Sequence, residues 1–107
     1  MRLGIMCSGN GTNFENIVTN PICKEHEVVL MIHNTKQCGA VKRAAKWGIP
    51  HVRIPHKDEE RMIEMFKVWR VDLIILAGLD RKQVARLCEE FKIERSKETL
   101  QSEYPPL

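Results

Sequence analysis

The sequence lacks several features that would place it in particular classes of protein. None of its four cysteines has C-x-x-C spacing with another, so neither a zinc site nor a redox motif is indicated. No apolar run approaches the roughly 20 residues that span a bilayer, so no membrane segment is expected. Lysine and arginine are scattered among acidic residues without a basic block, and the formal net charge is only +3. Nucleic-acid binding is therefore not indicated.

What is present is the composition of an ordinary globular protein. The 107 residues are 43% hydrophobic and 29% charged, which fits one domain with a modest core. The first residues lead directly into a strand-like segment and carry no cleavage signature, so no signal peptide is expected. Together with unpaired thiols, this predicts a reduced, cytoplasmic protein.

Strand-like and helix-like segments alternate along most of the chain. Apolar runs at residues 2–7, 27–33, 51–54 and 71–78 predict strands. Between them, apolar residues recur at helical spacing, and Pro21, Gly48 and Pro50 provide stop signals. Alternation of this kind predicts βαβ units, and runs without polar interruption are typical of parallel strands covered on both faces. We expect an α/β fold with a Rossmann-like parallel sheet of about four strands flanked by helices.

The character of the chain changes after Gly78. Val84, Leu87, Cys88 and Phe91 form one more helical stripe, and residues 92–107 are polar with no further strand expected. We therefore divide the chain into residues 1–78, a phosphate-binding part, and residues 79–107, a helix followed by a polar or disordered tail. A sheet that ended at the fourth strand would leave its edge uncovered and open to self-association.

The first strand leads into "SGNGTN", after which a helix begins. The start of a helix offers unpaired backbone N–H groups and a partial positive charge, and glycines let an anion approach closely. Thr12 and Asn13 add side-chain donors, and either residue is also suited to cap the helix. A tight connection without a ligand is the alternative interpretation.

Two familiar phosphate-binding loops fit this stretch badly. A P-loop needs a lysine after its glycines, and none is present here. A dinucleotide fingerprint needs a third glycine and an acidic residue at the end of the second strand, where this sequence has Phe14 and Asn34. The phosphate of a mononucleotide-type ligand is the favoured partner.

Other chemically interesting residues receive structural interpretations. The four histidines, at positions 26, 33, 51 and 56, show no ligand spacing, so we expect no metal site and assign no catalytic residue. Cys7 is expected to be a small buried apolar residue. Trp47 and Trp69, at the ends of helical stripes, are expected to serve in packing rather than in stacking on a ligand. The acidic residues 58–60 are expected to favour the start of a helix.

Three stretches resemble the phosphoribosylglycinamide formyltransferases. They are "SGNGTNFENIV", "HNTKQCGAVKRAAKWGIPHVRIP" and "VDLIILAG", which occur in the family's order and spacing up to about Gly78. The resemblance implies transfer of a formyl group from the co-substrate 10-formyltetrahydrofolate to glycinamide ribonucleotide in de novo purine biosynthesis. It also implies that Gly11, Thr12 and Asn13 hold the phosphate of this small-molecule ribonucleotide.

The same resemblance identifies a departure from the family. The family's catalytic Asn-Ile-His-Pro-Ser stretch is missing after Gly78, and only Arg81 falls near a folate-contacting position. This implies a truncated chain with an incomplete folate pocket that is inactive alone, although it descends from an enzyme. The alternatives are a non-catalytic ribose-phosphate-binding fragment or a frameshifted relic. For the latter, codons for "SEYPPL" exist whose adjacent frame reads Val-Asn-Ile-His-Pro-Ser.

Overall fold

The fold is a parallel sheet between two pairs of helices. The computed structural model describes residues 1–20, 26–34, 39–55, 57–79 and 81–95. The strands in this part of the chain are β1 (Arg2–Cys7), β2 (Glu27–His33), β3 (His51–Arg53), β4 (Leu73–Ala77) and β5 (Lys92–Arg95). The helices are α1 (Thr12–Thr19), α2 (Gly39–Lys46), α3 (Glu59–Val68), the short 3₁₀-helix η2 (Arg81–Val84) and α4 (Ala85–Glu90).

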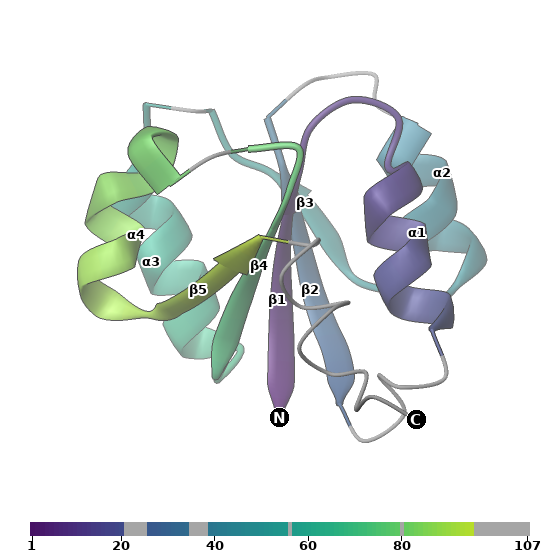
Figure 1. Cartoon of the computed structure of the whole chain (residues 1–107), viewed down its shortest axis with the longest axis horizontal. Helices are drawn as coiled ribbons and strands as arrows, with labels where there is room; N and C mark the ends of the chain where they lie inside the picture. Colours follow the sequence, from purple (N-terminus) through teal and green to yellow (C-terminus); the bar gives the residue numbers. More distant parts are fainter. Residues whose placement is uncertain (21–25, 35–38, 56, 80, 96–107) are drawn as a thin grey trace, which may run out of the picture.

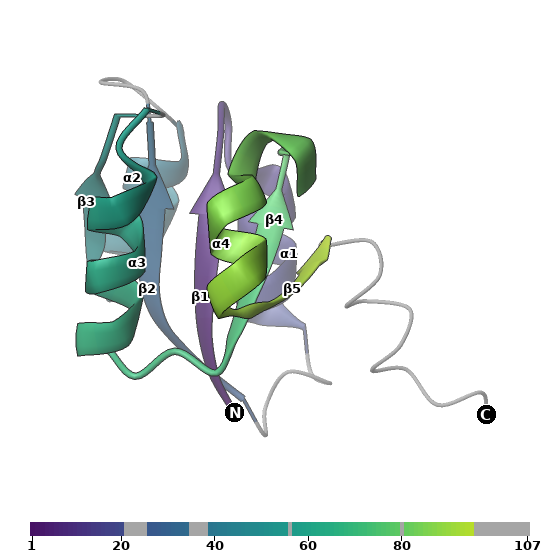
Figure 2. The same cartoon turned by 90° about the vertical axis from the view of Figure 1, so that its left-hand side faces the viewer.

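The strands lie in the order β3-β2-β1-β4-β5, and every neighbouring pair is parallel. Helices α1 and α2 cover one face of the sheet, and α3 and α4 cover the other (Figure 1). A view turned by 90° shows α3 and α4 on the near side of the strands (Figure 2). The expected α/β, Rossmann-like class is therefore confirmed.

The central strands are apolar because both of their faces are buried. In β4, Leu73, Ile75 and Ala77 pack with α1 and α2 in one core cluster, whereas Ile74 and Leu76 pack with α3 and α4 in the other. All five residues are at most 2% exposed. Alternate side chains of a strand point to opposite faces, so a strand between two helical layers needs an apolar residue at every position.

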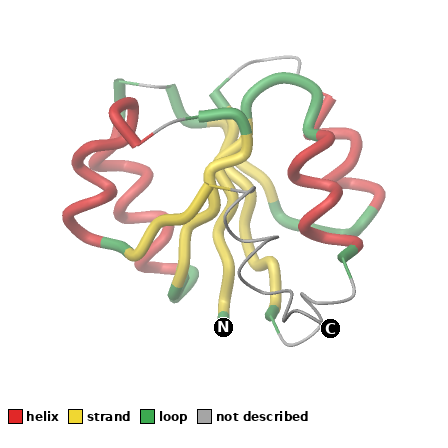
Figure 3. The backbone as a smooth tube through the Cα atoms, in the orientation of Figure 1, coloured by secondary structure: helices red, strands yellow, loops and turns green. Residues whose placement is uncertain are grey.

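The prediction of a sheet that stops at its fourth strand is wrong. β5 pairs with β4 from Leu73↔Lys92 to Leu76↔Arg95, and the tube view shows the two strands side by side (Figure 3). The edge of β4 that was expected to be bare is thus covered. The sequence pattern did not predict β5 because Ile93 is the only apolar residue in this strand. Charged residues at the other positions are typical of an edge strand and disfavour pairing with a second sheet.

The helices follow the expected periodicity at most positions. Asp58 is the N-cap of α3 and accepts a hydrogen bond from the Arg61 N–H, consistent with the expected role of this acidic run. Val84 and Leu87 are buried as predicted, but Cys88 is exposed, because a 3₁₀ turn precedes α4 and shifts the stripe. Among the described residues, no helix has the length and apolar character that a membrane span requires.

Gly4 of β1 provides a test of the core packing. A Cβ added to Gly4 would lie 2.5 Å from Cε1 of Phe66, a ring that α3 packs against the sheet. Gly4→Ala should therefore lower the free energy of unfolding by roughly 1–3 kcal/mol, measured by urea denaturation. Combining it with Phe66→Leu should cost less than the sum of the two single changes. If the losses in unfolding free energy of the two single variants simply added up in the double variant, contact with the Phe66 ring would not be the reason that position 4 requires glycine.

Candidate phosphate-binding site

The glycine-rich loop lies where the sheet changes its winding direction. From β1 the chain crosses to β2 on one side, and from β3 it crosses back to β4 on the other side of β1. Ligands of open α/β sheets bind at this switch point, beyond the carboxyl ends of the strands. A hollow of about 180 Å³ opens there. Its lining comprises Cys7, Ser8, Asn10, Gly11, Thr12, Asn13, Ala77 and Gly78.

The backbone of the loop leaves the start of α1 without a side-chain cap. Gly11 is the N-cap, with φ +82°, and the N-cap makes no side-chain capping hydrogen bond. Neither Thr12 nor Asn13 therefore caps the helix, which corrects one of the roles considered for them. Both are exposed in the hollow. Uncapped N–H groups at a helix start are the donors that an anion requires.

Ser8 joins the two strands that flank the hollow. Its backbone N–H donates to the Ala77 carbonyl over 3.3 Å, and its hydroxyl donates to the Gly78 carbonyl over 3.2 Å. A Cβ on Gly78 would lie 2.7 Å from the Ser8 Oγ, so the glycine permits this contact. Sequence reasoning missed this role of Ser8, because the two residues lie 70 positions apart.

Helix α2 packs directly behind the loop. A Cβ on Gly11 would lie 2.5 Å from the Cα of Ala40, and a Cβ on Gly39 would lie 2.4 Å from the Asn10 Oδ1. In both cases the space that a Cβ would need is already occupied by backbone or by a short side chain. Neither glycine can therefore be replaced unless the loop or α2 moves. The first turns of α1 and α2 therefore meet at Gly11.

The hollow is electrically neutral, and the nearest charges are organised beside it. None of its lining residues is ionisable except Cys7, which is buried in the core as expected. We call Glu15, Arg43, Lys46 and Trp47 the Glu15 cluster. Glu15 accepts hydrogen bonds from Arg43 Nη1 at 2.6 Å and from Trp47 Nε1 at 3.0 Å, and Lys46 lies 4.0 Å away. The Trp47 hydrogen bond, together with the two cations, lowers the pKa of Glu15 below its usual 4.5.

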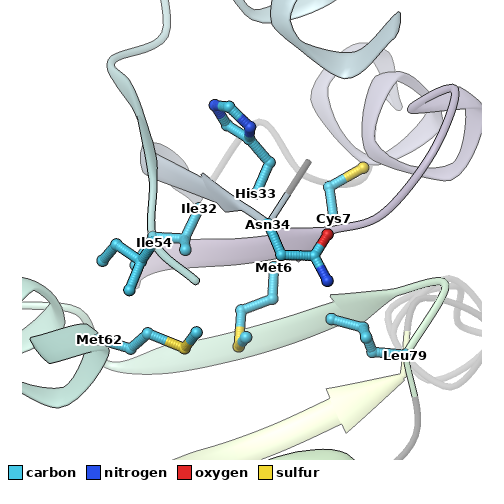
Figure 4. A pocket seen from close by; sticks show the side chains of 8 residues that line it. All are labelled: Met6, Cys7, Ile32, His33, Asn34, Ile54, Met62 and Leu79. Carbon is cyan, nitrogen blue, oxygen red and sulfur yellow. The ribbon is translucent and has the colours of Figure 1, made fainter. Parts of the chain in front are cut away.

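A second, much smaller hollow lies on the other side of β1. It is lined mainly by Met6, Ile32, Ile54, Met62 and Leu79 and holds about 10 Å³, space for roughly one water molecule. Figure 4 shows Met6 and Met62 in it, whereas Cys7 and His33 leave the sheet on the opposite face. The buried Asn34 Oδ1 has no hydrogen-bond partner. This space does not accommodate a folate ring system.

The remaining candidate residues do not assemble a second site in the described part of the chain. His33 is buried at the end of β2, with its ring 5.7 Å from that of the exposed His51, and His56 lies outside the described residues. No group of three potential metal ligands occurs in the described ranges. Arg81 donates to the Ile93 carbonyl and so ties η2 to β5.

The two tryptophans have different roles. Trp69 packs against the core beneath α3, as expected. Trp47 is 45% exposed, and its indole N–H, a hydrogen-bond donor, donates to the Glu15 carboxylate in the Glu15 cluster.

Solved structures identify the class of fold. The chain superposes on phosphoribosylglycinamide formyltransferase from Anaplasma phagocytophilum with a TM-score of 0.74 and 27% identity, covering 89% of this chain and 48% of that one. For the Geobacillus kaustophilus glycinamide ribonucleotide transformylase 1 the TM-score is 0.73, again at 27% identity, covering 88% and 56% of the two chains. The fold is thus that of a Rossmann-like formyltransferase.

Curated relatives agree with the structural neighbours. The Bacillus subtilis (strain 168) phosphoribosylglycinamide formyltransferase is 32% identical over 91 residues, which are 75% of this chain and 46% of that protein. The chloroplastic enzyme of Glycine max is 30% identical over 83 residues, 72% of this chain and 28% of that protein. No family model matches the chain. Over most of its length the chain is thus similar to phosphoribosylglycinamide formyltransferases in both sequence and structure, and it spans less than half of these two relatives.

Two glycines of the loop form a matched pair for mutation. Gly9 and Gly11 both have positive φ, so alanine at either position should cost roughly 1–2 kcal/mol in strain. Only at Gly11 would the new Cβ overlap the backbone of Ala40, because nothing lies within 4 Å at Gly9. Gly11→Ala should therefore be more destabilising than Gly9→Ala, by roughly 1–3 kcal/mol in urea denaturation. Equal losses would contradict the close packing of α2 on the loop.

The Glu15 cluster predicts a dependence of stability on pH. Because the folded-state pKa of Glu15 is lowered, its carboxylate contributes stability above the unfolded-state pKa, and this is lost as the pH falls through the folded-state value. Wild type should be more stable than Glu15→Gln at pH 6, and the difference should vanish near pH 2. Urea midpoints at both pH values measure this. Glu64→Gln, at an exposed position of α3, is the control, and a similar trend there would contradict the assignment.

Proposed function

We propose that the chain binds the phosphate of glycinamide ribonucleotide at Gly11, Thr12 and Asn13, and that it serves formyl transfer from 10-formyltetrahydrofolate in purine biosynthesis. The observation that carries the proposal is the uncapped start of α1, which faces a hollow at the switch point of a formyltransferase fold. The names of the relatives support the reaction, and the loop geometry supports the position of the substrate.

The chemistry of the loop favours a phosphate ester over other anions. Three or four N–H or hydroxyl donors around one hollow suit a tetrahedral group with several acceptor oxygens. Each hydrogen bond to a charged group is worth roughly 1.5–3 kcal/mol. Loss of translational and rotational freedom opposes them by at least about 4 kcal/mol. Without a cation in the lining, we expect a Kd near 1 mM for the ribose-phosphate part alone.

We further propose that this chain does not transfer the formyl group by itself. General acid–base catalysis needs a titratable group within hydrogen-bond reach of the reacting amine. All four histidines precede Gly78 in the sequence, and His33 is buried on the face covered by α1 and α2. The apolar hollow beside the loop is too small for the co-substrate. These observations support the proposal of a chain that binds the ribonucleotide without catalysing the transfer.

The alternative candidates make different predictions about ligands. A general ribose-phosphate binder would bind ribose 5-phosphate and glycinamide ribonucleotide equally well, because only the phosphate would be held. A part of a formyl-transfer site should bind glycinamide ribonucleotide more tightly. A frameshifted relic would bind neither.

Calorimetric titration tests the proposal with glycinamide ribonucleotide and with ribose 5-phosphate. Glycinamide ribonucleotide should bind the wild type, Gly9→Ala should retain most of the affinity, and Gly11→Ala should bind at least about tenfold more weakly, since a displaced loop misdirects its N–H groups.

Absence of binding at millimolar ligand would refute the proposed phosphate site. A formyl-transfer assay with 10-formyltetrahydrofolate and glycinamide ribonucleotide tests the second proposal, for which we expect no turnover above the buffer control. Turnover that survives further purification, and is lost in Gly11→Ala, would show that the chain is catalytic.

A further inference from the structure

Arg43 contacts the phosphate loop from behind and fixes two of its segments at once. The Nε–H of Arg43 donates to the Asn10 carbonyl at 3.0 Å, and Nη1 donates to the Glu15 carboxylate at 2.6 Å. Asn10 lies just before the N-cap of α1, whereas Glu15 lies in the first turn of α1. One guanidinium group therefore joins the loop to α1, the helix that begins at the end of that loop.

The rigid fork of arginine is what makes this bridge work. Its N–H donors point in fixed directions within one plane, whereas a lysine ammonium is a single point of attachment. The Arg43 and Glu15 side chains are only 28% and 22% exposed, so solvent screens their ion pair less than a surface pair. Trp47 occupies the other carboxylate oxygen, which leaves Glu15 little freedom to turn.

The bridge also removes an electrostatic obstacle. A carboxylate in the first turn of α1 is stabilised by the helix dipole, but it repels a phosphate bound at the same end of the helix. Arg43 and Lys46 compensate the charge of Glu15 on the side of α2. The loop thus keeps its N–H donors while its nearest negative charge is neutralised.

We infer that Arg43 is a positioning residue for phosphate binding: by joining the Asn10 carbonyl to the Glu15 carboxylate, it holds the N–H groups of residues 11–13 in the binding arrangement without touching the ligand. This deepens the proposed function and rests on it for the identity of the ligand. The ordering of the loop is a property of the protein alone and does not depend on the ligand.

The test compares three arginine variants of the whole chain. Arg43→Met removes both hydrogen bonds, and Arg43→Lys keeps the charge but cannot reproduce the fork. Arg86→Met is the matched control: Arg86, in α4, joins its helix to α3 through Glu60 and also contacts Glu89 of its own helix, and both helices lie on the other face of the sheet. Each variant is examined by ¹⁵N relaxation and by calorimetric titration with ribose 5-phosphate.

In the wild type, the amides of Gly11, Thr12 and Asn13 should have order parameters near 0.85, and both Arg43 variants should fall below about 0.6. If the binding-competent loop is then populated to about a tenth, the Kd for ribose 5-phosphate rises about tenfold. Arg86→Met should lower stability without changing either quantity.

Each other outcome is decisive. Unchanged order parameters in Arg43→Met, or an equal change in Arg86→Met, would overturn the positioning role. Full rescue by Arg43→Lys would show that charge alone matters and that the fork does not. A wild type that binds no ribose 5-phosphate would refute the proposed function, while the order parameters would still decide whether Arg43 orders the loop.

Discussion

The site depends on one close contact, between the loop that follows β1 and the first turn of α2. Gly11 and Gly39 face the backbone of Ala40 and the side chain of Asn10 at distances that exclude any Cβ. Two helix starts are thereby brought together at the switch point of the sheet. The shape of the loop is then determined by the packing of α1 against α2, because the loop has few internal hydrogen bonds of its own. Asn10 Nδ2 to Thr12 Oγ1, at 3.4 Å, is a long one.

The same arrangement explains why the loop carries no charge. Its donors are backbone N–H groups, which stay available only if no side chain caps the helix, and a Gly11 N-cap meets that requirement. The charges that hold the loop lie one layer behind it, in the Glu15 cluster. In the proposed site, the groups that position the loop are therefore not the groups that would bind the phosphate, so a bound ligand would not have to desolvate the Glu15 cluster.

Much of this fold follows from the sequence because burial on both faces leaves a strong signal. The apolar runs ending at Cys7 and Gly78 predicted β1 and β4, and the glycines after Cys7 predicted the loop. β5 left no such signal, since one buried residue, Ile93, is too little to show a pattern. The Arg43–Glu15 bridge left none either. It joins residues 28 positions apart on two helices, and a surface arginine and glutamate on amphipathic helices are indistinguishable from solvated ones until the helices are packed.

The neutrality of the hollow limits what it can do chemically. Formyl transfer moves a proton from an attacking amine, so a phosphate anchor raises the rate only by orienting that amine towards a reacting partner and a base. The hollow of the proposed phosphate site lies between the carboxyl ends of β1 and β4, and β5 lies beyond β4 in the same direction. A substrate held by its phosphate at Gly11 can therefore extend over the end of β4 towards β5. Acid–base groups that complete the reaction would have to reach the substrate from that side, because α2 closes the loop from behind and core side chains fill the sheet beneath.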